Sequence, residues 1–313
     1  MKTINDKNES LQSLMGLCLD LDQGPSAFRG QSDYRYSLIP GIYRELEKLA
    51  PPFNAEDDYE WLGELERDTY RNFIDKGRGI KSNQVTGDKW ESLFYGQHHG
   101  LPTRLLDWTT DHFAAIYFAV SGHNNIDGAL WHINIKEFPH PRILGRLSNN
   151  HAFRIEAVRS CVASDNLVFF VPQSKTAVFG SGSTTVGPPA FPSDQSKDSN
   201  RSGFLTFLFA PYTDDRIRNQ KGIFSIYLTD DPTDIVLDHA SYIEQLEKVY
   251  GIELLTKIII PASRKESIKR DLIKTGKDAF SIYPDLEGLV SMLKDERIST
   301  LEFYKDERKK WSK

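Results

Sequence analysis

The order in which two hydrophobic patterns occur along this chain constrains its fold more than any other feature of the sequence. In the first half, apolar residues recur at helical spacing, notably at 11–21, 59–75 and 89–97. The second half is richer in short apolar runs of strand length, at 167–171, 204–209, 222–228 and 254–261. Helices and strands do not alternate regularly, which argues against a doubly wound parallel sheet. The pattern predicts an α+β fold, in which a helical first half packs on a mostly antiparallel or mixed sheet formed largely by the second half.

Shorter signals predict the remaining elements. Strands are expected at 27–30 and 129–135, and helices at 42–49, 239–250 and 265–274. Residues 101–108 are expected to form a loop, because Pro102 and a polar mixture interrupt the helical spacing. The helix after this loop is expected to be capped by Thr109 or Thr110, with the carboxylate of Asp107 as the alternative. Ser263 and Glu266 form a capping-box pattern at a later helix start.

Composition divides the chain into three parts. Residues 1–25 are expected to form an N-terminal helix, 26–290 the main domain, and 291–313 the end of a C-terminal helix. That last helix is expected to begin near Leu286 and to run to Tyr304. Segment 174–202 is rich in Gly, Pro and Ser, so it is expected to be a long loop or mobile insertion. It is either a surface insertion or an active-site lid.

The charge and cysteine content exclude several classes of protein. The formal net charge is −5, from 39 basic and 44 acidic side chains, which argues against general affinity for nucleic acid. Two cysteines form neither a disulfide framework nor a cysteine-rich zinc site, and their sparse use fits a reducing compartment. The first ten residues lack an apolar core, and the longest apolar runs are too short to span a bilayer. We therefore expect a cytoplasmic protein without a membrane partner.

Three separated stretches carry the most specific motifs. The first is Phe28-Arg29-Gly30-Gln31, followed by 36–40 and by Tyr43-Arg44. The second is 97–109, with the unusual sequence QHHGLPTRLLDWT, which leads into 114–119. The third consists of Arg216, the segment 220–224 and the segment 283–289. Together they resemble the FRG domain family over about residues 26 to 290.

The order of these stretches is also similar to a distant ADP-ribosyltransferase layout, with an early Arg strand, a His-rich middle and a late Gln strand. This likeness implies NAD as the substrate and needs no metal. One departure is clear, since Gly222 stands where such transferases usually carry a Glu. We expect Glu287 to supply the missing catalytic carboxylate. The alternative role of Glu287 and Asp285 is favourable negative charge at a helix N-terminus.

Two arginines are candidates for binding phosphate. Arg29 lies beside Gly30, so its planar guanidinium can bind a phosphate in bidentate fashion while the ligand approaches the backbone. Arg44 is expected to converge on the same place. The alternative is that these side chains form structural ion pairs.

Two adjacent histidines are candidates for catalysis. His98 and His99 follow one another at a helix end, so their side chains point in different directions and only one is expected to reach a pocket. A pocket imidazole can donate a proton or anchor a hydroxyl, and the alternative is a structural His. The pair is a poor metal signal, because an HExxH spacing and nearby Cys are absent.

The remaining candidates lie on the second and third stretches. Arg104 is expected either to bind phosphate or to pair with Asp107 and hold the loop. Gln220 is expected to orient a ribose hydroxyl or to satisfy loose backbone groups. Tyr36 and Phe224 are expected to supply aromatic walls, with Phe224 and Ile223 on opposite faces of a strand.

Three functional hypotheses follow. The first is an NAD-binding ADP-ribosyltransferase-like enzyme or NAD glycohydrolase with a role as a toxin or in defence, acting with a protein or nucleic-acid acceptor. The second is a phosphodiesterase for RNA or DNA built from His98, His99, Arg104 and Asp107. The third is a non-catalytic module that binds a small phosphorylated ligand or nucleotide, or a protein partner.

Overall fold

The computed structural model describes residues 1–5, 10–44, 57–77, 89–138, 204–209, 215–228, 236 and 238–311. The strand expected at 167–171, the insertion expected at 174–202 and most of the helix expected at 42–49 lie outside these residues.

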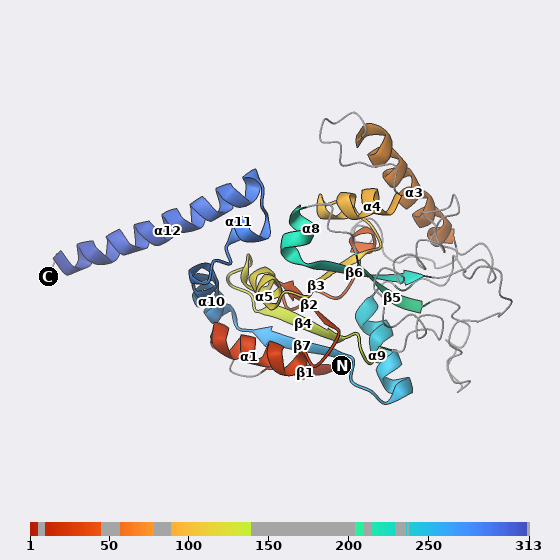
Figure 1. Ribbon diagram of the computed structural model, residues 1–313, viewed down its shortest axis with the longest axis horizontal. Helices are drawn as coiled ribbons and strands as arrows, with labels where there is room; N and C mark the ends of the chain where they lie inside the picture. Colours follow the sequence, from red (N-terminus) through yellow and green to blue (C-terminus); the bar gives the residue numbers. More distant parts are fainter. Residues whose placement is uncertain are drawn as a thin grey trace.

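A seven-stranded mixed sheet forms the centre of the described structure (Figure 1), with the strand order β1-β7-β4-β2-β3-β6-β5. Only the pairing of β1 with β7 is parallel, among the described strands. This sheet and the flanking helices confirm the predicted α+β class. Both halves of the chain supply strands, namely β1 (Lys2–Ile4), β2 (Ser26–Gln31), β3 (Leu106–Thr109), β4 (Gly128–Asn134), β5 (Phe204–Phe209), β6 (Gly222–Leu228) and β7 (Leu255–Ile260).

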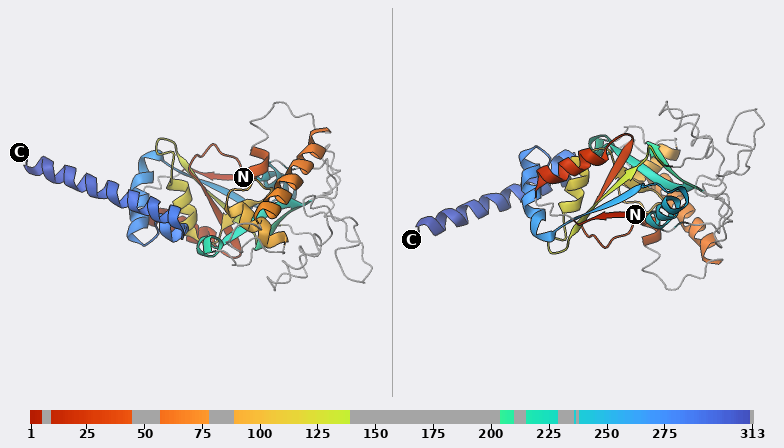
Figure 2. Two further views of the ribbon diagram at one scale, coloured as in Figure 1. Left: turned by 90° about the horizontal axis from the view of Figure 1, so that it is seen from above. Right: turned by 90° about the horizontal axis from the view of Figure 1, so that it is seen from below.

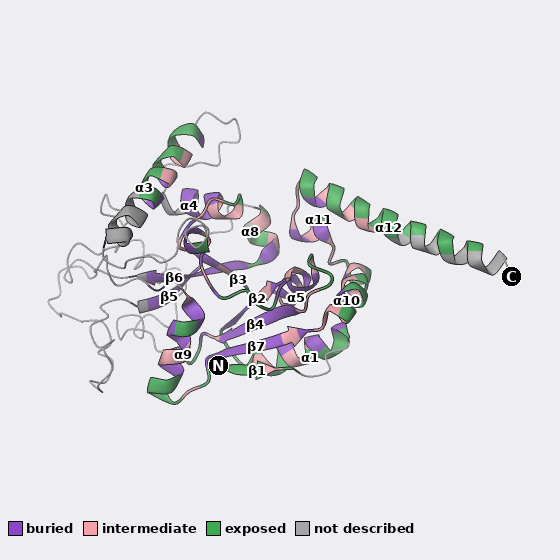
Figure 3. Cartoon of the chain, turned by 180° about the vertical axis from the view of Figure 1, so that it is seen from behind, coloured by how far each residue is buried: buried purple, intermediate pink, exposed green. Residues whose placement is uncertain are grey.

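Helices cover both faces of this sheet. One face packs on α1 (Leu11–Leu21), α5 (His112–Val120), α10 (Ala262–Lys274) and α11 (Ala279–Ile282), through a cluster that contains Phe28 and Leu130. The other face packs on α9 (His239–Tyr250), through a cluster that contains Trp108 and Trp131. Alternate residues of each strand therefore enter different cores, so the central strands are buried on both sides (Figure 3).

The remaining helices lie around one end of the sheet or extend from it. Helices α3 (Asp57–Gly77) and α4 (Lys89–His98) pack on one another, and α8 (Asp215–Gln220) leads directly into β6. Helix α12 (Leu286–Trp311) contacts the rest of the structure near its start and then projects away from it (Figures 1 and 2). It is longer than the predicted segment ending at Tyr304.

The sheet splits between β2 and β3. Strand β2 pairs with β4 at six positions and β3 pairs with β6 at four, but β2 and β3 pair only at Phe28 and Thr109. Beyond this pair the two strands diverge, so Arg29 to Gln31 on one strand and Asp107 on the other border an opening. The split positions the candidate functional site.

Three local predictions are wrong for identifiable reasons. The expected loop at 101–108 contains the start of β3, because Leu106 to Thr109 pair with Ser225 to Gly222 of β6. Since β3 continues through Thr109, the cap of α5 is Asp111, whose carboxylate accepts hydrogen bonds from the backbone of Phe113 and Ala114. Helix α10 begins at Ala262, before Ser263, so its N-cap is Pro261 and the capping box does not form.

Candidate functional site

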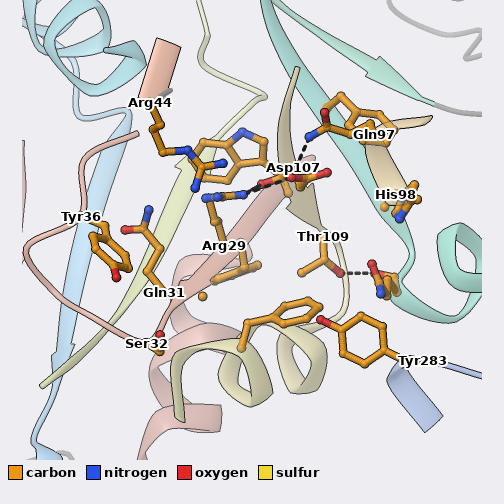
Figure 4. Close-up of a pocket in the computed structure, with 17 residues that line it drawn as sticks. Arg29, Gln31, Ser32, Tyr36, Arg44, Gln97, His98, Asp107, Thr109 and Tyr283 are labelled. Carbon is orange, nitrogen blue, oxygen red and sulfur yellow. Dashed lines mark hydrogen bonds and ion pairs between the residues drawn. The ribbon is translucent and has the colours of Figure 1, made fainter. Parts of the chain in front are cut away.

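Two adjoining chambers occupy the opening between β2 and β3, and Figure 4 shows the residues that line the inner one. The inner chamber has a volume of about 360 Å³ and is lined by residues of β2, β3, β6 and α4 together with Tyr283. The outer chamber has a volume of about 630 Å³ and is lined mainly by the segments 35–44 and 97–102. Both volumes are in the range of small-molecule sites. The two chambers share a rim, which we call the neck, formed by Gln31, Tyr36, Arg44, Gln97 and Asp107.

Arg29 projects from β2 into the inner chamber. Its Nη1 donates a 2.6 Å hydrogen bond to the backbone oxygen of Asp107 and lies 3.6 Å from the carboxylate of the same residue. Its Nε is buried and has no hydrogen-bond partner among the described residues. Burial lowers the pKa of Arg29, and repulsion by Arg44 adds to this effect while Asp107 opposes it. An Arg remains charged even so, and its unsatisfied N–H favours an anionic ligand.

Arg44 faces Arg29 from the helical turn at 41–44. Figure 4 shows the two guanidinium groups pointing toward one another across the neck. Within the described part of the chain, Arg44 has no hydrogen bond or ion pair with another side chain. Two neighbouring guanidinium groups with a single nearby carboxylate form a site suited to phosphate groups.

Asp107 supplies that carboxylate. Its Oδ2 accepts a 3.0 Å hydrogen bond from Nε2 of Gln97, which also donates to the backbone oxygen of Leu105. The hydroxyl of Thr103 donates to Oε1 of Gln97 and so fixes the orientation of its amide. The side chain of Asp107 is still 44% exposed, which leaves its carboxylate open to a ligand in the neck.

Gln220 and Thr109 form the inner end of the site. The hydroxyl of Thr109 donates to the backbone oxygen of Gln220 and accepts from the backbone N–H of Asp111. Gln220 is buried, and its Nε2 donates to the backbone oxygen of Ile282 at 3.3 Å. Gln220 therefore lines the chamber while it satisfies a backbone group, which was one of its two expected roles.

Aromatic side chains form the walls of the inner chamber. Phe224 contacts His98 edge to face, with ring centroids 5.6 Å apart, and Phe118 contacts Tyr283 in the same way at 6.1 Å. Phe224 faces the chamber while Ile223 packs in the opposite core, as predicted. Burial raises the pKa of Tyr283 to about 12, so this phenol is neutral and can donate a hydrogen bond.

Arg216 joins the second and third motif-bearing stretches of the sequence. Its guanidinium pairs with Asp285, donates to the backbone oxygen of His98 at 3.2 Å and lies 5.4 Å from the ring centre of Tyr283. The end of α4, the helix α8 and the segment before α12 are therefore held together at the inner chamber.

The structure brings six of the predicted site residues to the inner chamber. These are Arg29, Tyr36, Arg44, His98, Gln220 and Phe224. Three others line neither chamber, namely His99, Arg104 and Glu287. His99 is exposed and packs its ring on Tyr95 with centroids 4.4 Å apart, so of the adjacent histidines only His98 reaches the chamber.

Arg104 and Glu287 lie elsewhere for different reasons. Arg104 is buried in an ion pair with Glu66 of α3, so the expected pairing with Asp107 is wrong. Burial raises the pKa of Glu66 and Arg104 opposes this change. Glu287 is 90% exposed on α12, with its carboxylate 3.6 Å from Arg216. It lies in the first turn of that helix, which agrees with the alternative reading of favourable helix-terminal charge.

Several residues of the site did not stand out in the sequence. Gln97 and Tyr283 lie within the quoted motifs but were given no role, and Asp107 was expected to pair with Arg104, to cap a helix or to belong to a phosphodiesterase centre. Their positions within these motifs were the only sequence signal that pointed to a role in the site. Thr109 was expected only as a helix cap, and Gln31 and Phe118 gave no local signal of their own. Within the described residues, no group of three or more His, Cys, Asp or Glu side chains is arranged to hold a metal.

The fold and the site define a class of protein, an α+β protein whose split central sheet holds an arginine-lined and aromatic-lined cavity. More specifically, residues 24–128 of the chain match the model of the FRG domain. This range supplies β2, β3 and all five residues of the neck. No curated protein and no solved structure matches the chain. None of the described helices is both long and apolar enough to cross a membrane.

Proposed function

We propose that the two chambers bind NAD and that the protein cleaves the bond between nicotinamide and ribose, as an ADP-ribosyltransferase or an NAD glycohydrolase. The observation that carries this proposal is the neck, where a half-exposed carboxylate lies beside two guanidinium groups and next to an aromatic chamber. Guanidinium groups suit a diphosphate, and an aromatic chamber suits the flat nicotinamide ring.

The chemistry assigns a role to each group. The bond between ribose C1′ and the pyridinium nitrogen breaks heterolytically, and both electrons leave with neutral nicotinamide. The positive charge that develops on the ribose is stabilised by the carboxylate of Asp107. Water or an acceptor hydroxyl, amine or carboxylate then forms a bond to C1′, and any proton it carries is released. Gln97 holds Asp107 in place, and Arg29 with Arg44 binds the diphosphate.

Asp107 replaces Glu287 as the proposed catalytic carboxylate. Asp107 lies on the neck and faces the ligand space, whereas Glu287 lies on the surface of α12. The nuclease alternative is not proposed further. It required four residues to act together, and two of these, His99 and Arg104, line neither chamber.

The test compares the two carboxylates by release of free nicotinamide from NAD. We expect Asp107→Asn to lower the rate by about 100-fold or more, because an amide cannot stabilise the developing cation. Glu287→Gln is the matched control and should retain the wild-type rate. Equal rates for Asp107→Asn and wild type would contradict the assignment.

Arg44 provides a separate test of binding. Arg44→Ala removes an exposed guanidinium without a partner among the described side chains, so the fold should tolerate it. We expect the affinity for ADP-ribose, measured by calorimetry, to fall about tenfold or more, because a charge-assisted contact is lost. Binding of ADP-ribose without nicotinamide release by the wild type would reject the enzyme and leave a nucleotide-binding module.

A further inference from the structure

Arg35 lines the outer chamber, and its guanidinium group is held in a fixed orientation by a neighbouring carboxylate. Nε of Arg35 lies 2.9 Å and 3.2 Å from the two carboxylate oxygens of Asp33, and its Nη2 lies 2.6 Å from Oδ2. The backbone N–H of Arg35 also donates to this carboxylate. Asp33 is 4% exposed whereas the Arg35 side chain is 61% exposed. The carboxylate of Asp33 therefore holds one edge of the guanidinium and fixes its plane, while much of the Arg35 side chain remains exposed to solvent.

A fixed guanidinium plane is a suitable surface for an aromatic ring. Arg stacks on flat rings through its delocalised plane, and a side chain already held in place loses little entropy when a ligand binds. The rest of the outer chamber is suited to the same ligand, since Tyr36, Ile39, Leu101 and Pro102 also line it. Stacking of a base on an Arg plane and aromatic side chains is a common means of recognising nucleotides.

The size of the chambers gives an independent reason to expect a base in the outer one. The inner chamber, at about 360 Å³, lies at the lower end of the range for small-molecule sites, so the larger part of a dinucleotide must extend through the neck. The outer chamber, at about 630 Å³, begins at the neck residues Arg44 and Asp107. If the nicotinamide end lies beside Asp107 in the inner chamber, the other nucleoside must enter the outer chamber.

We infer that the outer chamber is the adenine subsite and that the guanidinium of Arg35, held by Asp33, is the stacking platform for this base. This inference rests on the proposed binding of NAD. Arg35 is then a determinant of specificity for the adenosine half of the ligand, and takes no part in bond cleavage.

The test measures the affinities of two probes by calorimetry. ADP-ribose contains adenine, whereas nicotinamide mononucleotide lacks the adenosine half. We expect Arg35→Ala to weaken ADP-ribose about tenfold, or 1.4 kcal/mol, and to leave nicotinamide mononucleotide unchanged. Arg35→Lys should lose nearly as much affinity for ADP-ribose, because it keeps the charge but lacks the plane. Retained affinity in Arg35→Lys, or an equal loss for both probes, would overturn the inference.

A matched control removes another exposed arginine that is paired with a carboxylate. Arg270 on α10 is 54% exposed, lies 3.7 Å from Glu266 and lines neither chamber. Arg270→Ala should leave both affinities unchanged. The two proposals fail in distinguishable ways. If the wild type binds neither probe, the proposed function is rejected, whereas binding of both probes without dependence on Arg35 rejects only the adenine subsite.

Discussion

At the scale of single residues, Lys265 holds the loops behind the cavity. The residue is 1% exposed, and Nζ is surrounded at 2.7 to 3.2 Å by the backbone oxygens of Ser32, Gly122, His123 and Ile126, which share its three N–H groups. Ser32 lines the inner chamber, and His123 contacts the hydroxyl of Tyr36 at the neck. Burial lowers the pKa of Lys265, and Asp33 and Asp127 oppose this change. A buried ammonium of this kind is stable only because carbonyl groups replace its water.

We expect Lys265→Met to lower the free energy of unfolding by about 3 kcal/mol or more. The replacement leaves buried carbonyl oxygens without a donor, and each such group costs about 1–3 kcal/mol. Urea unfolding followed by circular dichroism measures the change. Lys269→Met on the same helix is the control, because among the described residues Lys269 pairs with the partly exposed Asp295, and the change should cost about 1 kcal/mol or less. Similar losses for both variants would contradict the role of Lys265.

Two buried histidines make the stability of the protein depend on pH. Burial lowers the pKa of His132 to about 4, against the opposing charge of Asp22, and burial together with Arg29 lowers the pKa of His239 to about 3. Ser225 accepts a hydrogen bond from Nε1 of Trp108, and its hydroxyl lies 3.0 Å from Nδ1 of His239. His239 is therefore neutral in the folded protein. Neither ring nitrogen of His132 has a partner among the described residues.

We expect the free energy of unfolding to fall as the pH drops from 6.5 towards 4. The unfolded chain binds protons at both imidazoles below pH 6.5, the reference pKa, while the folded protein does not until about pH 4 or 3. Each histidine then costs about 1.4 kcal/mol per pH unit in this window and nothing above it. His132→Leu should reduce the slope of the free energy of unfolding against pH by the contribution of one histidine. Urea titrations at several pH values between 6.5 and 4 measure this slope. An unchanged slope would show that His132 is protonated in the folded state.

At the scale of elements, the contact between β2 and α5 depends on glycine. A methyl group on Gly30 would overlap the backbone oxygen of Ala115 and lie 2.6 Å from the backbone nitrogen of Ala119. A methyl group on Gly128 of β4 would likewise overlap the backbone oxygen of Ala119. Helix α5 therefore lies directly on two strands, so the Gly that follows Arg29 serves the packing behind the site. The sequence had instead suggested that Gly30 is present to let a ligand approach the backbone.

We expect Gly30→Ala to destabilise the protein by about 3 kcal/mol or more, because the clash is with a helix backbone that cannot rotate away. Gly16→Ala is the control, since nothing lies within 4 Å of the added methyl group. Gly16 lies within α1, so this second change should raise the free energy of unfolding by about 1 kcal/mol or less. Thermal melts of the two variants should shift in opposite directions, and a tolerated Gly30→Ala would contradict the close packing.

At the scale of the whole molecule, Arg216 couples α12 to the cavity. Arg216 contacts Asp285, Tyr283 and the end of α4, and α12 begins at Leu286. Beyond its first turns this helix projects from the body and exposes Leu293, Ile298, Leu301 and Tyr304 (Figure 3). Its orientation therefore depends on contacts near its start, which include Tyr283 of the inner chamber, and on the ion pair of Asp295 with Lys269.

We expect Arg216→Ala to speed amide hydrogen exchange in residues 283–290 and to weaken ADP-ribose binding, without changing exchange in α1. The physical reason is the loss of the ion pair and hydrogen bond that hold this segment against α4. Arg218→Ala on the same helix is the control, because Arg218 is 59% exposed and pairs with Asp215 within its own helix. Unchanged exchange at 283–290 in Arg216→Ala would contradict the coupling.

The sequence predicted much of the fold and part of the site. The described parts of the apolar runs at 204–209, 222–228 and 254–261 are strands, and the helical patterns at 11–21, 59–75 and 239–250 are helices. These predictions succeed because local periodicity reports which face of an element is buried. Strand β3 was not predicted, because it has only four residues and follows a segment that contains Pro102. A strand this short shows little periodicity in its sequence.

The sequence by itself determined the α+β class and the three motif-bearing stretches. Periodicity, composition and residue size are local properties, and they can be read without knowing any partner. Tertiary structure decided that Arg104 meets Glu66, 38 positions away, and that Asp107 instead of Glu287 faces the cavity. The neighbouring Gly288 turns toward the body, so Glu287 turns to solvent, and this rotation of α12 is fixed only by packing. The single pair that joins β2 to β3 is equally non-local, and it creates the cavity.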